Sequence, residues 1–359
     1  MREIEQHLRR IIARDGPISV ARFMAEALGH PTHGYYARGD PFGRAGDFIT
    51  APEVSQMFGE LIGLWCAHSW GQMDRPPRFV LVELGPGRGT LLADALRAAR
   101  IEPEFLRAAL LHLVETSPAL KAKQRESLAD IPVVWHDDIA GVPDGPLIAI
   151  ANEFFDALPI RQFERTERGW RERLVTLDES RDSFAFTLAQ APPPEVPAAG
   201  RRGKGGIAEV SPAAIELARV LGARVARDGG AALIIDYGEI EGGAGDTLQA
   251  VRRHRPWPRL ARPGSADLTA HVDFAALARA AREAGAAVHG PRPQGEFLRA
   301  LGIEERARRL LAGASDAQAR EIRSALVRLI DERRMGGLFK VLCLAHPELP
   351  TPAGYEDWP

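Results

Sequence analysis

Apolar residues run almost without interruption through four segments in the middle of the chain. Between these segments apolar positions recur at helical spacing, as in 90–100 and in the stretch opened by Ser117. The uninterrupted segments predict strands at 78–85, 109–115, 133–138 and 145–155. Continuous apolar strands that alternate with helices are typical of a parallel sheet covered by helices on both faces. The pattern therefore predicts an α/β fold.

The N-terminal part of the chain predicts helices instead of strands. Residues 1–14 carry apolar side chains at helical spacing, and Ser19 is a suitable N-cap for a second short helix. A loop rich in Gly and Pro at 29–52 separates these helices from a further helical pattern at 53–70. Residues 1–77 are therefore expected to form a helical cap in front of the sheet.

Beyond the fourth strand the regular alternation is interrupted twice. Residues 160–206 predict an antiparallel hairpin followed by a Pro- and Gly-rich linker. Residues 239–272 form a long irregular stretch, and such stretches in compact enzymes are often lids or binding loops. The core of the fold is thus expected at 78–159 and 207–346, with a C-terminal tail at 347–359.

Composition and charge narrow the class of protein. Hydrophobic residues make up 45% of the 359 residues, and 46 Lys and Arg against 48 Asp and Glu give a net charge of −2. This balance argues against a broad nucleic-acid-binding surface, which would be basic. Two distant cysteines cannot form a disulfide framework, and no apolar run approaches the ~18 residues of a membrane span. An enzyme of the cytoplasm is the leading expectation.

The most informative segment follows the first predicted strand and precedes a helix. It reads E-x-G-x-G-x-G, with Glu83, Gly85, Gly87 and Gly89, and Pro86 lies within it. Glycines there let the backbone approach a ligand closely. The spacing is one residue short of a P-loop and lacks its Lys, and it differs from the G-x-G-x-x-G of dinucleotide-binding proteins. It resembles motif I of class I S-adenosylmethionine-dependent methyltransferases, in which the loop wraps the methionine end of the cofactor.

Acidic residues at the ends of the next strands fit the same ligand. Glu115 ends the second strand, where a carboxylate can accept hydrogen bonds from both ribose hydroxyls. Asp138 follows the third strand, where a carboxylate can accept from the adenine amino group, and the adjacent Asp137 competes for that role.

Two carboxylates and an amide follow the fourth strand. Asn152, Glu153 and Asp156 lie in the sequence NEFFDALP. The carboxyl ends of parallel strands line the ligand crevice of such sheets. The carboxylates are therefore candidates for chemistry, although Asp156 could instead cap the next helix.

Five blocks of the sequence together resemble one known family. They are GDFITAPEVSQMFGELIG (46–63), VELGPGRGTLLADALR (82–97), NEFFDALPIRQF (152–163), DLTAHVDF (267–274) and GLFKVL (337–342). These blocks are similar to those of the MidA family of class I methyltransferases, which includes the mitochondrial complex I assembly methyltransferase. The resemblance implies a seven-stranded Rossmann-like sheet that binds S-adenosyl-L-methionine. For the mitochondrial members it implies symmetric dimethylation of an arginine in a complex I subunit.

The resemblance also implies roles for residues near the N-terminus. Asp47 and Thr50 belong to the block that is expected to close over the cofactor and the substrate channel. The segment 254–264 departs from the family, because Trp257 and Arg259 stand where a more acidic stretch is expected. This departure concerns the detail of substrate contacts and not the fold.

An arginine acceptor sets a chemical requirement. A guanidinium is cationic and a poor nucleophile, so carboxylates that orient it and accept its proton are needed. We hypothesise that Glu153 and Asp156 face the acceptor, with Asp47 and His271 as second candidates.

Other interpretations remain open from the sequence alone. The chain could be an assembly factor that acts mainly by docking to a partner, or a methyltransferase for a small molecule. An NAD-dependent oxidoreductase is disfavoured by the glycine spacing. His30 and His33 form H-x-x-H without a nearby third ligand, so no metal site is expected. No mitochondrial presequence is recognisable, which favours a bacterial cytoplasmic protein, and the oligomeric state is not predicted.

Overall fold

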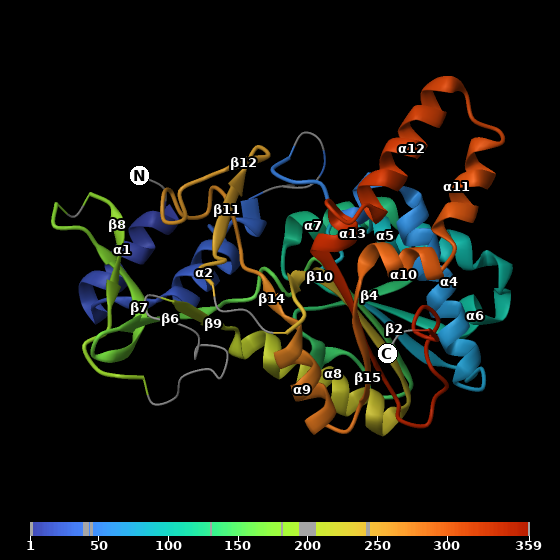
Figure 1. Ribbon diagram of the computed structural model, residues 1–359, viewed down its shortest axis with the longest axis horizontal. Coiled ribbons are helices and arrows are strands. Elements are labelled where there is room, and N and C mark those ends of the chain that lie inside the picture. Colours follow the sequence, from blue (N-terminus) through green and yellow to red (C-terminus); the bar gives the residue numbers. More distant parts are fainter. Residues whose placement is uncertain are drawn as a thin grey trace.

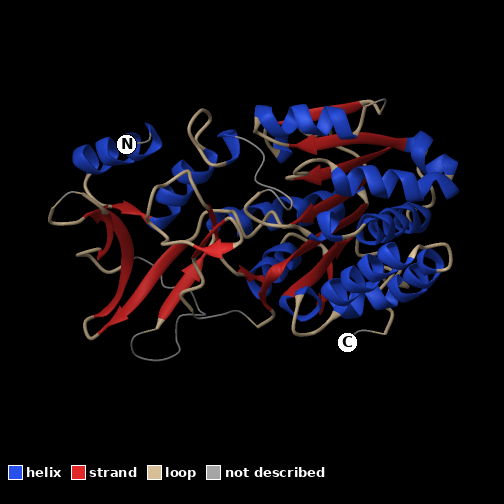
Figure 2. Cartoon of the chain, turned by 90° about the horizontal axis from the view of Figure 1, so that it is seen from above, coloured by secondary structure: helices blue, strands red, loops and turns tan. Residues whose placement is uncertain are grey.

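The computed structural model describes residues 3–38, 43, 46–129, 131–180, 182–193, 206–241 and 245–357. Figures 1 and 2 show two bodies side by side: a large sheet with helices on both faces, and a smaller assembly of short strands and helices beside it. In the described part of the chain no helix is both long enough and apolar enough to cross a membrane.

The large sheet is mostly parallel. Its path consists of seven strands, and β16 runs antiparallel to both of its neighbours. In spatial order they are β4 (Val133–His136), β3 (Ala109–Val114), β2 (Phe79–Leu84), β5 (Leu147–Asn152), β10 (Gly230–Glu239), β16 (Phe339–Ala345) and β15 (Ala287–Pro293). A two-residue strand, β14 (Val272–Asp273), also pairs with β10. The predicted seven-stranded α/β sheet is confirmed.

Successive residues of a strand point to opposite sides of the sheet, and helices bury both of these faces. In β10, Leu233 packs in a cluster on one face, and Ile234 packs in a separate cluster on the other. The first face is covered by α4 (Gln56–Gln72), α5 (Thr90–Ala98), α6 (Pro103–Ala108), α10 (Gln294–Ala300), α11 (Ile303–Leu311), α12 (Asp316–Ile330) and α13 (Met335–Leu338). The second face is covered by α8 (Pro212–Asp228) and α9 (Phe274–Glu283).

Two glycines bring α4 against α5, the helix that follows the glycine-rich turn. A Cβ at Gly59 would lie 2.7 Å from the Cβ of Asp94, and one at Gly63 would fall on the backbone of Ala95. Larger side chains at these positions would push the two helices apart. Part of the block GDFITAPEVSQMFGELIG thus packs α4 closely against α5.

The smaller body, which we call the flanking lobe, is built from three separate stretches of the chain. Its sheet contains β1 (Ile18–Ser19), β6 (Arg161–Thr166), β7 (Gly169–Leu177), β8 (Phe184–Leu188) and β9 (Ile207–Val210). A second sheet contains β11 (Gln249–Arg252), β12 (Arg255–Pro256) and β13 (Asp267–Thr269). Helices α1 (Glu3–Asp15) and α2 (Val20–Gly29) pack on them.

One hydrophobic core joins these three stretches. Leu8 of α1, Phe23 of α2, Val175 of β7 and Leu268 of β13 belong to the same cluster. The predicted hairpin is present as β6 and β7, whereas the segment 239–272 is not irregular as expected, because it carries the three-stranded sheet. The part of the insertion at 194–205 lies outside the described residues.

The remaining elements lie in the connections between those already described. They are η1 (Tyr36–Arg38), α3 (Ala51–Val54), η2 (Ala99–Ile101), α7 (Pro118–Ser127) and η3 (Ile139–Gly141). Ser117 caps α7, as the sequence predicts, by accepting the N–H of Leu120 at 3.3 Å.

Candidate active site

The carboxyl ends of β2, β3, β5 and β10 open into one cavity of about 630 Å³ that the flanking lobe closes from the other side. Ligands of open parallel sheets bind beyond these strand ends. The lining residues come from both bodies and include Met24, Leu28, Tyr36, Gly85, Glu115, Asp137, Glu153, Asp156, Tyr237, Asp267 and His271. The cavity is therefore the candidate active site.

The glycine-rich turn after β2 forms one edge of the cavity. Gly85, Gly87 and Gly89 have φ angles of 63°, 54° and 80°, a region that L side chains rarely adopt. A Cβ at Gly85 would lie 2.5 Å from the ring of Phe154, so the turn admits no side chain there. Gly89 is the N-cap of α5, which leaves the first N–H groups of that helix at the turn.

A smaller pocket beside this turn shares Gly85, Gly87 and Glu153 with the cavity. It is also lined by Thr50, Glu83, Pro86 and Asn152. Within the described residues, the buried Oε2 of Glu83 and Oδ1 of Asn152 have no hydrogen-bond partner. Burial raises the pKa of Glu83 to about 8. Because an unpaired buried acceptor costs free energy, the pocket favours a ligand that donates hydrogen bonds, such as an ammonium group.

Glu115 lies where the sequence predicts, at the end of β3 on the cavity wall. Its Oε1 accepts the N–H of Ser117 at 2.7 Å, and its Oε2 accepts Nε2 of Gln124 at 3.2 Å. Gln124 also donates to the carbonyl of Gly87 at 2.8 Å and accepts from Trp135 at 2.8 Å. Sequence reasoning missed Gln124, because no motif marks a glutamine on a polar helix.

The two neighbouring aspartates after β4 take different places. Asp137 lines the cavity and accepts from Lys121 Nζ at 3.0 Å. The carboxylate of Asp138 instead caps η3 by accepting the N–H of Gly141 at 3.0 Å, and Asp138 is not among the lining residues. The prediction that Asp138 contacts the adenine therefore disagrees with the geometry, and Asp137 has the better position. The strand β4 ends at His136, two residues earlier than expected, so both aspartates lie in the turn that follows it.

The turn after β5 is held by a carboxylate that the sequence did not single out. Oδ2 of Asp236, in the carboxyl-terminal half of β10, accepts the N–H groups of Phe154, Phe155 and Asp156 at 3.0–3.1 Å. Its Oδ1 accepts the N–H of Tyr237 at 2.9 Å. These bonds fix the turn, in which Glu153 has the unusual φ of +50°. Asp236 was overlooked because it lies within an apolar strand, where a buried acid gives no motif.

Three carboxyl groups converge on the cavity beyond this turn. Oε1 of Glu153 accepts the N–H of Ala51 at 2.7 Å, and Tyr36 donates to Oδ1 of Asp267 at 3.0 Å. Burial raises the pKa values of Glu153 and Asp267 to about 8 and that of Asp156 to about 6. Such environments favour a cationic partner, which would restore the charged carboxylates. Asp267 has no predicted role of its own in the sequence analysis, because it appears there only as the first residue of the block DLTAHVDF.

The structure places His271 and Asp47, the second candidates for catalysis, in different surroundings. His271 lines the cavity, and its ring meets the Tyr237 ring edge-on with centroids 5.5 Å apart. Asp47 is absent from the described lining; it accepts from Tyr35 at 2.7 Å and from the N–H of Arg253 at 2.7 Å. Asp47 thus joins the loop before α3 to the β11–β12 turn, so its position argues against the expected catalytic role.

Comparison with known proteins decides the family. Residues 61–292 match the family model described as "Putative S-adenosyl-L-methionine-dependent methyltransferase". The mouse mitochondrial protein arginine methyltransferase NDUFAF7 is 40% identical over 94% of this chain and 83% of its own length, and the human protein is 37% identical over 94% and 82%. This chain belongs to that methyltransferase family.

The solved structures agree with the family. A "likely methyl transferase" from Burkholderia thailandensis bound to S-adenosyl-homocysteine is 30% identical, with a TM-score of 0.85 over 99% of this chain and 94% of that chain. The methyltransferase described here uses S-adenosyl-L-methionine as its cofactor. The unpaired acceptors of Glu83 and Asn152 and the side-chain-free glycine turn fit the ammonium end of that molecule.

Proposed function

We propose that this methyltransferase methylates an arginine side chain of a protein. The observation that carries the proposal is the charge of the cavity: the described lining residues include five acids and no Lys or Arg. A guanidinium stays cationic at all accessible pH values, and paired carboxylates bind it through two parallel hydrogen bonds. The printed name of the relatives, protein arginine methyltransferase, supports this choice of acceptor.

The proposed roles follow the two pockets. Glu83, Asn152, Thr50 and the glycine turn would hold the amino-acid end of the cofactor, and Glu115 its ribose. S-adenosylmethionine supplies an electrophilic methyl group on a sulfonium. On the acceptor side, this chain's residues orient the guanidinium and take up the proton that its nitrogen loses on methylation.

Glu153 and Asp156 are the residues proposed for that proton and that orientation. Both line the cavity, and a cationic guanidinium bound there would lower the raised pKa of Glu153, so that its carboxylate can accept the proton. Asp267 and Tyr36 form the opposite side of the cluster and belong to the flanking lobe region. His271 adds an imidazole at the same wall.

The finer identity of the acceptor and the location of the enzyme are further parts of the proposal. The family resemblance supports a subunit of respiratory complex I as the protein substrate. We also propose a cytoplasmic location for this enzyme, whereas the names of the relatives place those proteins in mitochondria.

The test uses the purified protein, labelled S-adenosylmethionine and a cell lysate, with the labelled species identified by mass spectrometry. We expect label on arginine of one or a few proteins. Glu153→Gln and Asp156→Asn should each lower the rate by about 10²–10³. The matched control is Glu283→Gln, which changes an exposed carboxyl on α9 and should leave the rate unchanged. Label found only in small metabolites would reject the protein-arginine proposal.

A further inference from the structure

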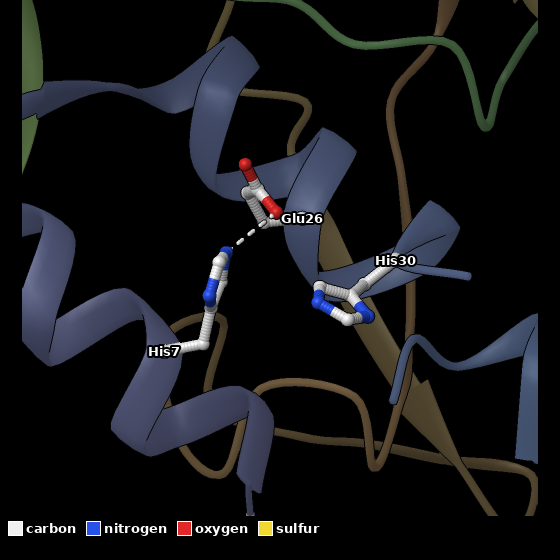
Figure 3. Close-up of side chains that lie close together, drawn as sticks. All are labelled: His7, Glu26 and His30. Atoms are coloured by element: carbon white, nitrogen blue, oxygen red, sulfur yellow. Dashed lines mark hydrogen bonds and ion pairs between the residues drawn. The ribbon is translucent and has the colours of Figure 1, made fainter. Parts of the chain in front are cut away.

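A cluster of two imidazoles and a carboxylate lies on the flanking lobe, outside the cavity described above. Figure 3 shows His7 of α1 facing Glu26 of α2, with His30 at the end of α2 beside them. One nitrogen or oxygen of each lies within 4.8 Å of the others. The sequence shows only the pair His30 and His33, and the fold supplies the missing ligands from α1 and from the preceding turn of α2.

Packing fixes the backbone that carries these side chains. On α1, Ile4 and Leu8 flank His7 and are buried in the core of the lobe. On α2, Glu26 and His30 are four residues apart, so their side chains lie on the same side of the helix. The two helices therefore present the half-buried side chains of the cluster from a rigid base.

Neighbouring groups already hold the ligand atoms in orientation. Oε2 of Glu26 accepts from Nε2 of His7 at 3.0 Å, and Oε1 lies 3.6 Å from Nε of Arg22. The ring of His33 stacks on that of His30 with centroids 5.0 Å apart, and its Nδ1 lies 2.8 Å from a carboxylate oxygen of Glu3. Such outer contacts are typical of metal ligands, whose orientation is set by a second layer of partners.

We propose that His7, Glu26 and His30 bind one Zn²⁺ ion, with water as the fourth ligand. Two imidazoles and one carboxylate with an open position form a donor set that zinc prefers in a tetrahedral arrangement.

The geometry also limits the affinity. Tetrahedral ligands with bonds of about 2.0–2.1 Å stand roughly 3.3 Å apart, so the side chains must close around the ion. Nδ1 of His30 accepts the N–H groups of Thr32 and His33 at 3.3 and 3.2 Å, and Figure 3 shows its other nitrogen facing the cluster. Zinc on that nitrogen requires the proton to move to Nδ1, which breaks both bonds. We therefore expect an affinity of about 1–10 µM, weaker than that of zinc-finger sites.

The position of α2 gives the ion a structural consequence. Met24 and Leu28 of the same helix line the catalytic cavity, whereas α1 does not contribute to the described lining. An ion bound between His7 and Glu26 would join α1 to this wall. Zinc should consequently stabilise the flanking lobe without touching the cofactor or the acceptor.

The experiment measures Zn²⁺ binding to the tag-free full-length protein by competition with a chromophoric chelator. We expect one ion per chain, and His7→Ala or His30→Ala should each weaken binding at least tenfold. The matched control His33→Ala removes a ring that stacks on His30 without being a ligand, and should change the affinity less than threefold. Co²⁺ should give the visible absorption of a four-coordinate site in the wild type and in His33→Ala only.

Thermal unfolding shows whether a variant that loses zinc binding is still folded. Zinc should raise the midpoint of the wild type and of His33→Ala, and leave His7→Ala and His30→Ala unchanged, with all four giving the same circular dichroism spectrum without metal. No binding at 100 µM Zn²⁺, or stoichiometric binding that survives both histidine variants, would overturn the proposal.

Discussion

The large sheet and the flanking lobe differ in how their buried residues are distributed along the chain. Every residue of β2 and β5 is buried, and each of these strands is followed closely by the segment that covers or continues it. In β7 of the lobe only Val175 is buried, and its core partners Leu8 and Leu268 lie far away in sequence. The strands of the sheet are therefore marked by continuous apolar runs in the sequence, whereas the core of the lobe is formed by distant segments without such runs.

The two regions supply different residues to the candidate active site. The sheet supplies the glycine turn, Glu115 and Glu153, so it carries the positions proposed for the cofactor. The lobe supplies Met24, Leu28 and Asp267 to the wall of the same cavity. Changes in the sheet should consequently abolish cofactor binding, and changes in the lobe should alter stability or acceptor use.

The strongest test of this division is Gly87→Val. A branched side chain at a φ of 54° strains the turn and fills the space that a ligand needs, so S-adenosylhomocysteine affinity should fall more than 100-fold by calorimetry. Gly169→Val is the matched control, because Gly169 also has positive φ (93°) but lies in the β6–β7 turn of the lobe. It should lose about 1–2 kcal/mol of stability and keep its affinity. Unchanged affinity of Gly87→Val would contradict the division.

A pair of leucine variants compares the two cores directly. Leu8 and Leu233 are both fully buried, so each change to Ala should cost about 2–5 kcal/mol in the free energy of unfolding. In Leu8→Ala the loss should stay local: amide hydrogen exchange should accelerate in β7 and β13 while β2 and β10 remain protected. Leu233→Ala should accelerate exchange throughout the sheet. Equal acceleration of β2 in both variants would show that the lobe is not a separate unit of stability.

The same contrast explains what the sequence could predict of the fold. The strands 78–85 and 145–155 could be located because continuous apolar runs and glycine turns are local signals. The sheet at 249–269 was missed because its strands are two to four residues long and pair inside one irregular stretch. The joint core of α1, β7 and β13 has no local signal, since its members share no periodic pattern.

The site shows the same limit at the level of single residues. Glu115 and Glu153 were found because they follow strands whose ends meet in space. Asp236 and Gln124 were missed because they act through backbone and side-chain partners that only the fold brings near. Asp47 was assigned to chemistry because it stands in a recognisable block, but a block of sequence does not separate a residue that binds ligand from one that joins two loops.

Acidic groups of the two regions should respond to pH with opposite sign. Burial raises the pKa of Glu153 to about 8, so the folded state holds a proton that the unfolded state loses near pH 4.5, and its stabilisation declines as pH rises through 8. Arg259 and Gln162 lower the pKa of Asp246 in the lobe despite its partial burial. Its stabilisation is present above its unfolded pKa and is lost as pH falls.

Unfolding experiments between pH 3 and pH 8.5 test the sign of the pH dependence for both residues. Glu153→Gln should match the wild type at pH 5 and exceed it by about 1–3 kcal/mol at pH 8, because the amide remains neutral. Asp246→Asn should be less stable than the wild type at pH 7 and equal to it near pH 3. Parallel curves for the wild type and Glu153→Gln would show that Glu153 is already ionised at pH 5.

The smallest expected effect concerns the adenine end of the cofactor. Asp137 lines the cavity, but it is exposed and shares its carboxylate with Lys121, so its loss removes about 1 kcal/mol. Asp137→Asn should therefore weaken S-adenosylhomocysteine binding about 3- to 10-fold, and Asp138→Asn should leave it unchanged. An analogue that carries inosine in place of adenosine lacks the amino group and should bind equally to the wild type and to Asp137→Asn. If Asp138→Asn discriminates between the two ligands instead, the facing of the pair in the bound state is the one first expected from the sequence.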